Sequence, residues 1–396
     1  MDSDVEIEAL VRSRNVIVCV GSGGVGKTTM SAAIALKAAE LGRTVCVLTI
    51  DPARRLANAL GLESLGNVET VVDRARFEAA GLPAPAGQLW AMTLDPKRTW
   101  DDLVRRFAAD EAQAQRILGN HYYQQISSAI AGSQEFMAME KLYELHESGT
   151  YDLIVLDTPP ARHALDFLDA PKKMMGFMDE SVLNVLLAPG RVGLSLFQTS
   201  GAWMFAALQR LTGFEVLRDI SEFVRSFSGM HAGFRDRAAR VETLLRASGS
   251  TVLLVTSPNP PTVEEALTFR RKLVDYGMPW AGFVVNRVHG SALGEPGAAE
   301  AWAALRQDPA RLLTGLDVPG TPDLAARVAD NLERFEALAQ RDAVQVDRLA
   351  RACAGPGLRS TVPAFDEDVH DLSGLARINR HLFPERNQSH ALYVHR

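Results

Sequence analysis

The chain has 396 residues, of which 47% are hydrophobic and 23% charged, and its formal net charge is −6 at pH 7. That length suggests about two to three structural units, and the composition is ordinary for a soluble globular protein. The negative balance argues against a nucleic-acid binder, because a phosphate backbone requires a basic face. The apolar runs fall short of the ~20 residues that span a bilayer, and the acidic N-terminal residues lack signal-peptide features. We therefore expect a cytoplasmic protein whose membrane association, where it occurs, is transient.

Five runs that are nearly continuous in apolar residues predict strands covered on both faces of a parallel sheet: residues 15–20, 44–50, 152–156, 251–256 and 280–285. Helical patterns separate these runs. One predicted helix follows the first strand and ends near Leu41, before Gly42. Another begins at a capping box, Thr262 to Glu265, and closes at Gly277. This alternation predicts an α/β fold with a doubly wound, mostly parallel sheet.

Two segments without strand signals, residues 100–146 and 171–246, interrupt the alternation, and both carry apolar residues at helical spacing. We expect them to pack together as an inserted all-helical subdomain on the edge of the sheet. The Met- and Phe-rich positions between Met174 and Met230 form either the core of that subdomain or a groove for an apolar client. We predict five units in chain order. The sheet domain begins with residues 1–99 and continues, after a helical insertion at 100–146, with a switch-bearing part at 147–170. A helical subdomain at 171–246 precedes the remaining sheet and C-terminal helices at 247–396.

The most informative motif is a glycine-rich turn between the first predicted strand and the helix after it, formed by Gly21, Ser22, Gly23, Gly24, Val25, Gly26, Lys27, Thr28 and Thr29. Glycines let successive N–H groups wrap a phosphate, and the helix adds its positive N-terminal end. In this motif Lys27 reaches the β- and γ-phosphates, and the Thr28 hydroxyl ligates Mg²⁺. We therefore predict a P-loop NTPase core that binds a nucleoside triphosphate.

Three polar residues stand where predicted strands end. Asp157 follows four apolar residues, as in a Walker B strand whose carboxylate holds the Mg²⁺ shell, and the prolines after it lead into a candidate nucleotide-sensing switch. Asp51 either orients or deprotonates the attacking water, or forms an Asx turn that caps a helix beginning near Pro52. The Asn286 amide is suited to a purine edge, although Asn is also common where strands end.

Taken in order, these motifs resemble the ATPase family that includes the arsenite-pump ATPase and the guided-entry targeting ATPase for tail-anchored membrane proteins. The resemblance covers nearly the whole chain and is closest to a bacterial-type member with one ATPase domain. It includes Asp51-Pro-Ala, Asp157-Thr-Pro-Pro followed by His163, and a C-terminal stretch, 361–372, in which Pro363 is the clearest match.

The resemblance implies ATP and Mg²⁺ as ligands, with Lys27 and Asp157 in the catalytic machinery and water activation by Asp51. It further implies adenine contacts from Asn286 and Pro363, and switch behaviour over residues 157–165. A dimer with facing nucleotide sites is also implied.

Two departures from the family pattern are informative. Ser22 occupies the position at which the family carries a lysine that reaches into the partner's site, and a serine cannot supply that charge. We therefore expect a heterodimer with a lysine-bearing paralogue in preference to a homodimer. Cys353 is the single cysteine of the C-terminal region, and the helical insertions contain no cysteine. The sequence therefore favours neither zinc closure of a dimer nor stimulation by metalloids.

The favoured function is ATP hydrolysis coupled to capture or delivery of a hydrophobic or membrane-protein client. One alternative is a cytoplasmic ATPase subunit of an anion-export membrane transporter. Others are a partitioning or cytoskeletal switch, which the tail broken by Pro384 disfavours, and a low-activity regulatory subunit that binds ATP.

Overall fold

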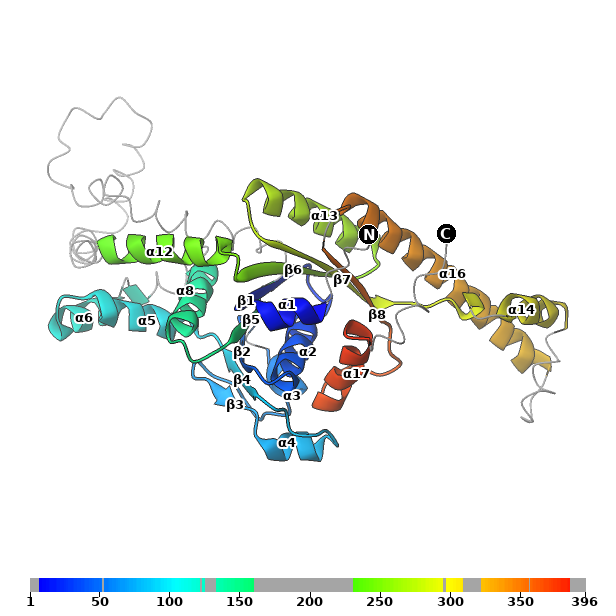
Figure 1. The fold of residues 1–396 in the computed structure, drawn as a ribbon, viewed down its shortest axis with the longest axis horizontal. Coiled ribbons are helices and arrows are strands. Elements are labelled where there is room, and N and C mark those ends of the chain that lie inside the picture. The colour runs from blue at the N-terminus through cyan, green and yellow to red at the C-terminus, as the bar shows by residue number, and fades with distance from the viewer. Residues whose placement is uncertain are drawn as a thin grey trace, which may run out of the picture.

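The computed structural model describes residues 7–51, 53–121, 123–124, 133–159, 231–294, 297–308, 322–355 and 357–384. Within these ranges an eight-stranded sheet lies at the centre of the molecule, in the order β3-β4-β2-β5-β1-β6-β7-β8 (Figure 1). Neighbouring strands are parallel except β3 and β4, which confirms the predicted mostly parallel α/β sheet. The strands are β1 (Val16–Val20), β2 (Thr44–Thr49), β3 (Thr70–Val71), β4 (Gln88–Thr93), β5 (Leu153–Asp157), β6 (Ser250–Thr256), β7 (Trp280–Val288) and β8 (Leu358–Pro363).

Helices cover both faces of the sheet, because successive residues of its central strands point to opposite sides. Along β1, Val16 and Val18 belong to one apolar core, whereas Ile17 and Cys19 belong to the other. The first core is completed by α8, α12, α13 and α16, and the second by α1, α2, α3 and α17. The described helices are α1 (Ile7–Ser13), α2 (Lys27–Glu40), α3 (Arg55–Ala59), α4 (Arg74–Ala79), α5 (Pro96–Phe107), α6 (Glu111–Leu118), α8 (Ser133–Glu147), α12 (His231–Arg246), α13 (Pro260–Asp275), α14 (Ala298–Gln307), α16 (Pro322–Ala352) and α17 (Leu372–Leu382), with the 3-10 turn η1 (Ala292–Gly294).

The five predicted strands are confirmed, with ends that shift by at most a few residues. The sequence search missed β3, β4 and β8. These strands lie toward the two edges of the sheet and carry polar positions, such as the exposed Gln88 and the half-buried Ser360, in place of a continuous apolar run. Pro363, predicted in a C-terminal loop, is therefore the last residue of a strand paired with β7.

Two helix predictions have different outcomes. Gly42 and Gly277 follow α2 and α13 with φ angles of 87° and 63°, as the predicted helix ends require. The predicted capping box is wrong, because α13 begins at Pro260 with Asn259 as its N-cap. The Thr262 hydroxyl instead donates a hydrogen bond to the carbonyl of Ser257, five residues earlier in the chain, at 2.8 Å.

The described part of residues 100–146 is helical, as its apolar spacing predicts, and forms most of α5, the whole of α6 and α8 up to His146. Trp100 and Leu103 of α5 are buried, as are Met139 and Leu142 of α8. The predicted location was wrong: α8 contacts β5 and α12 contacts β6, so these helices cover a face of the sheet and not its edge. In Figure 1, α5 and α6 extend this layer beyond the sheet. Of the second predicted insertion, residues 171–230 lie outside the described residues.

A buried ion pair joins the two helices of this layer. Arg237 of α12 donates through Nε to Glu140 Oε1 of α8 at 2.7 Å, and through Nη1 to Glu147 Oε2 at 2.7 Å. The Glu140 side chain is 1% exposed, and burial raises the pKa of its carboxyl while Arg237 opposes the shift. Removal of Arg237 would therefore leave the buried Glu140 carboxylate without its hydrogen-bonded partner and with the longer contact to Arg106, whose Nη1 lies 3.8 Å from Glu140 Oε1.

We predict that Arg237→Leu lowers the free energy of unfolding by about 3–5 kcal/mol. The double variant Glu140→Leu, Arg237→Leu should recover most of that loss, because neither charge then remains buried. The control is Arg246→Leu, which breaks an exposed pair with Glu242 and should cost less than about 1 kcal/mol. Denaturant unfolding measures all three, and a single variant no less stable than the control would contradict a structural role for the pair.

Among the described helices, none combines the length and apolar character that a membrane crossing requires. The long helix α16 contacts β7 of the sheet. As Figure 1 shows, its other end lies at the side of the molecule opposite α6, and there Glu333 pairs with Arg306 of α14.

Candidate functional site

The glycine-rich turn connects β1 to α2 as predicted, and the close approach of its backbone explains two glycines. A Cβ on Gly21 would lie 1.9 Å from the Val255 carbonyl oxygen. Gly26 is the N-cap of α2 with a φ of 96°, and no side chain caps the first turn of the helix. The first N–H groups of α2 therefore have no side-chain partner, and they lie beside a cavity of about 570 Å³. Backbone N–H groups in this arrangement bind anions.

Lys27 bends back over its own loop. Its ammonium nitrogen donates to the Ser22 carbonyl at 2.9 Å, and the side chain is buried. Burial lowers the pKa of Lys27, while the carboxylates of Asp157 and Asp51 oppose the shift. The lysine thus lies among acceptors that an incoming phosphate can replace.

Asp157, at the end of β5, is the buried acidic centre of the site. Its Oδ2 accepts hydrogen bonds from the Thr28 hydroxyl at 2.6 Å and the Thr49 hydroxyl at 2.8 Å. Its Oδ1 is buried and has no hydrogen-bond partner among the described residues. Burial raises the pKa of Asp157 to about 6, although both hydroxyls and Lys27 oppose the shift.

These oxygens fit a magnesium ion. Mg²⁺ binds through one or two carboxylate or hydroxyl oxygens and keeps several waters. Asp157 Oδ1 is a buried acceptor without a partner, and the Thr28 hydroxyl lies next to the same carboxylate. A cation there would remove the unfavourable burial of the Asp157 charge.

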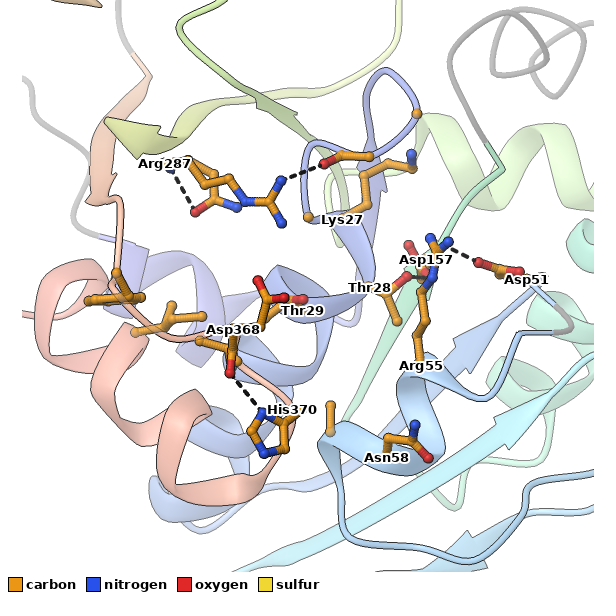
Figure 2. Close-up of a pocket in the computed structure, with 18 of the residues that line it drawn as sticks. Lys27, Thr28, Thr29, Asp51, Arg55, Asn58, Asp157, Arg287, Asp368 and His370 are labelled. Carbon is orange, nitrogen blue, oxygen red and sulfur yellow. Dashed lines mark hydrogen bonds and ion pairs between the residues drawn. The ribbon is translucent and has the colours of Figure 1, made fainter. Parts of the chain in front are cut away.

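Asp51 forms an Asx turn, since its Oδ1 accepts from the Ala53 N–H at 2.9 Å. The predicted helix cap is wrong, because α3 begins at Arg55 with Arg54 as its N-cap. Asp51 Oδ2 lies 3.5 Å from Nη1 of Arg55 on α3. Figure 2 shows this ion pair between Arg55 and Asp51. Asp51 nevertheless lines the cavity, so the turn interpretation and a chemical role are compatible in this geometry.

The opposite wall of the cavity is formed by the ends of β7 and β8. Asn286 Nδ2 donates to the Val25 carbonyl at 2.9 Å, and Arg287 Nη1 donates to the Gly24 carbonyl at 3.3 Å. Pro363 pairs with Val288 across a register shift between the two strands. Both Asn286 and Pro363 line the cavity, so the chain brings together motifs that are hundreds of residues apart.

Three residues of the glycine-rich turn do not line the cavity. Gly21 lies against Val255, and Val25 is buried in the core beneath the turn. Ser22 is buried, and its hydroxyl donates to Glu265 Oε2 of α13 at 2.6 Å. The predicted site residues that do line the cavity are Gly23, Gly24, Gly26, Lys27, Thr28, Thr29, Asp51, Asp157, Asn286 and Pro363. The switch residues Pro160 to Leu165, including His163, lie outside the described residues.

Sequence reasoning missed several lining residues, among them Arg55, Asn58, Arg287, Phe365 and His370. Arg55 and Asn58 lie three positions apart on α3, the helix after Asp51, and that spacing was a usable signal. Nothing in the sequence marked Arg287, because its position depends on an irregularity in strand pairing.

A comparison with protein families identifies the family that these motifs resemble. Residues 14–309, about three quarters of the chain, match the family model described as anion-transporting ATPase. The chain belongs to this family. The predicted resemblance and the P-loop fold are therefore both confirmed.

Individual relatives are similar over shorter stretches. The chain is 32% identical over 152 residues to the ATPase get3 of Aspergillus terreus, covering 38% of this chain and 41% of that protein. It is 32% identical over 154 residues to the ATPase GET3 of Pyricularia oryzae, covering 38% and 41%. It is 31% identical over 197 residues to a candidate arsenical pump-driving ATPase of Halobacterium salinarum, covering 48% and 29%. The chain thus spans less than half the length of these curated relatives.

We predict that Asp157→Asn makes the ligand-free protein more stable than wild type at pH 8. The folded pKa, about 6, lies above the unfolded value of about 3.9, so the unfolded state binds fewer protons between those pH values. Wild-type stability therefore falls as the pH rises through that window, by up to about 3 kcal/mol, and the neutral amide avoids the loss.

The measurement is denaturant unfolding at several pH values without Mg²⁺ or nucleotide. The gap between variant and wild type should shrink as the pH falls from about 6 to about 4. Asp236→Asn, on the surface of α12, controls for the loss of an exposed carboxylate. An Asp157→Asn variant less stable than wild type at pH 8 would show that the ionised carboxylate does not destabilise the site.

Proposed function

We propose that this protein binds ATP with Mg²⁺ in the cavity beside the glycine-rich turn and hydrolyses it in the cytoplasm. The observation that carries the proposal is the Thr28–Asp157 hydrogen bond of 2.6 Å beneath an uncapped helix N-terminus. The same two side chains would hold the metal ion. When bound, Mg²⁺ supplies charge neutralisation for the phosphates. Membership of the anion-transporting ATPase family supports this reading.

The protein's own groups then have distinct tasks. Backbone N–H groups of the turn and Lys27 hold the phosphates, which is mostly a matter of positioning and electrostatic stabilisation. Asp51 orients the attacking water or accepts its proton. Because Asp51 is paired with Arg55, that exposed ion pair must open or shift before the carboxylate can act. Pro363 and the residues after it enclose the nucleoside end of the cavity.

We further propose that the working unit is a dimer with a homologous subunit, and that the partner carries the lysine that this chain lacks. The Ser22 hydroxyl donates to the exposed Glu265 carboxylate, so the position at which the family carries a lysine supplies no cation in this chain. Membership of the anion-transporting ATPase family supports this assembly by analogy, since the family resemblance implies a dimer with facing nucleotide sites.

For the cargo, we propose a hydrophobic or membrane-protein client. The methionines of the described helical layer, including Met137 and Met139, are fully buried and act as core. The Met- and Phe-rich positions between Met174 and Met230, which the sequence offers as core or client groove, lie outside the described residues. The second candidate is the ATPase subunit of an anion-export transporter, which the similarity to the Halobacterium salinarum protein favours. Purification of the ATP-bound form separates the two candidates. A retained hydrophobic or membrane-protein client favours the first, and a retained transporter favours the second.

The proposed chemistry predicts that Asp51→Asn retains ATP affinity and loses turnover by roughly 100-fold or more, because only the water-activating group changes. Calorimetry measures ATP binding, and phosphate release measures turnover. Lys27→Ala serves as the comparison variant and should lose binding as well. Full turnover by Asp51→Asn would exclude the carboxylate from the chemical step.

The proposed pairing predicts slow turnover by the chain alone and faster turnover when a lysine-bearing paralogue is added. Ser22→Lys, assayed alone, should recover part of the missing activity, since the added ammonium can be supplied from one copy to the other. Phosphate release across a series of protein concentrations tests this. Full activity of the wild-type chain by itself would contradict the heterodimer.

A further inference from the structure

Two neighbouring residues at the end of β7 hold two neighbouring residues of the glycine-rich turn. Asn286 Nδ2 donates to the Val25 carbonyl at 2.9 Å, and Arg287 Nη1 donates to the Gly24 carbonyl at 3.3 Å. Both acceptors belong to the main chain. These contacts fix the direction of two consecutive peptide groups in the turn.

The direction of a carbonyl determines the direction of the N–H that follows it. A peptide group is planar and trans, so its C=O and N–H point to opposite sides, and the described residues contain no cis peptide bond. With the carbonyls of Gly24 and Val25 held toward β7, the N–H groups of Val25 and Gly26 are turned away from β7. Those N–H groups belong to the turn that, in the proposed function, surrounds the phosphates.

The contact with Asn286 is close as well as polar. Its side chain is 7% exposed, and a Cβ placed on Gly26 would lie 2.4 Å from its Nδ2. Its Oδ1 accepts from the Arg287 N–H at 3.0 Å, which fixes the orientation of the amide. The Asn286 amide therefore already has partners on the side of the turn.

Arg287 reaches the turn because the backbone is irregular at that point. Its φ of 61° lies in the left-handed region, which residues other than glycine rarely adopt. The β7–β8 register also shifts between Asn286 and Val288. A bulge of this kind re-aims a side chain, and the left-handed conformation is unfavourable for a residue with a Cβ. Figure 2 shows the Arg287 side chain extending from the end of β7 to the turn that carries Lys27. Such strain is commonly maintained at functional sites.

We propose that Asn286 and Arg287 are positioning residues for the phosphate cradle: they hold the carbonyls of Gly24 and Val25 so that the next N–H groups face the polyphosphate. The proposal rests on the proposed ATP site and deepens it. It differs from the expectation that Asn286 reads the adenine edge, because a positioning residue acts on any polyphosphate, with or without a base.

The experiment compares Mg²⁺-dependent binding of ATP with that of inorganic tripolyphosphate, which has neither base nor ribose. Asn286→Ala should weaken both by the same factor, about five- to tenfold, because one hydrogen bond to the turn is lost. Arg287→Gly should also weaken both, and glycine suits the left-handed backbone, so this variant keeps the bulge. Arg271→Ala, an exposed arginine of α13, controls for the loss of one positive charge.

The outcomes are distinct. Weakening of ATP alone assigns Asn286 to the base and overturns the proposal, as does unchanged binding of both ligands by the two variants. If Arg271→Ala loses as much affinity as Arg287→Gly, the effect of Arg287 is one of net charge, and the positioning role of Arg287 is overturned. If wild type binds neither ligand, the proposed function fails and this inference with it. Circular dichroism confirms folding. If Asn286→Ala does not fold, the result rests on Arg287→Gly, because the Arg287 side chain is exposed and its removal leaves the core intact.

Discussion

The site depends on one buried carboxylate at the end of a central strand. Asp157 is charged at neutral pH although burial raises its pKa to about 6, and the Thr28 and Thr49 hydroxyls supply its hydrogen bonds. Because these hydroxyls come from α2 and β2, Asp157 joins three elements at a single point. An unpartnered oxygen beside them is destabilising in the ligand-free protein and suited to a cation. The same unfavourable burial that reduces stability thus prepares the site for its ligands.

The sheet order places that carboxylate beside the phosphate-binding turn. Because β1 lies between β5 and β6, the turn that follows β1 has Asp157 on one side and the end of β6 on the other. The next strand, β7, contributes the side chains that contact the turn from outside. Parallel strands end at the same edge of a sheet, so residues 25, 157 and 286 lie at that edge although they are far apart in the sequence. Function in this chain is therefore concentrated at one edge of the sheet, while the helical layer and α16 extend away from it (Figure 1).

The sequence was informative where a motif fixes local geometry or where both faces of a strand are buried. The glycine-rich turn and the runs of β1 and β5 could be predicted on those grounds. β8 could not, because an edge strand with polar positions lacks a continuous apolar run. Asn286 could be selected as a site residue, but the direction of its amide depends on Val25, which is 261 positions away. The strand irregularity that re-aims Arg287 arises only in the folded sheet, so no pattern of residues indicated it.

The measurement that tests the central claim most directly is ATP binding by the purified chain, titrated calorimetrically with Mg²⁺ and again with the metal chelated. We expect one ATP per chain in the presence of Mg²⁺ and clearly weaker binding after chelation, because the ion that Asp157 and Thr28 would hold would neutralise phosphate charge. Absence of ATP binding under both conditions would contradict the central claim, and affinity unaffected by chelation would remove the metal-binding role of Asp157.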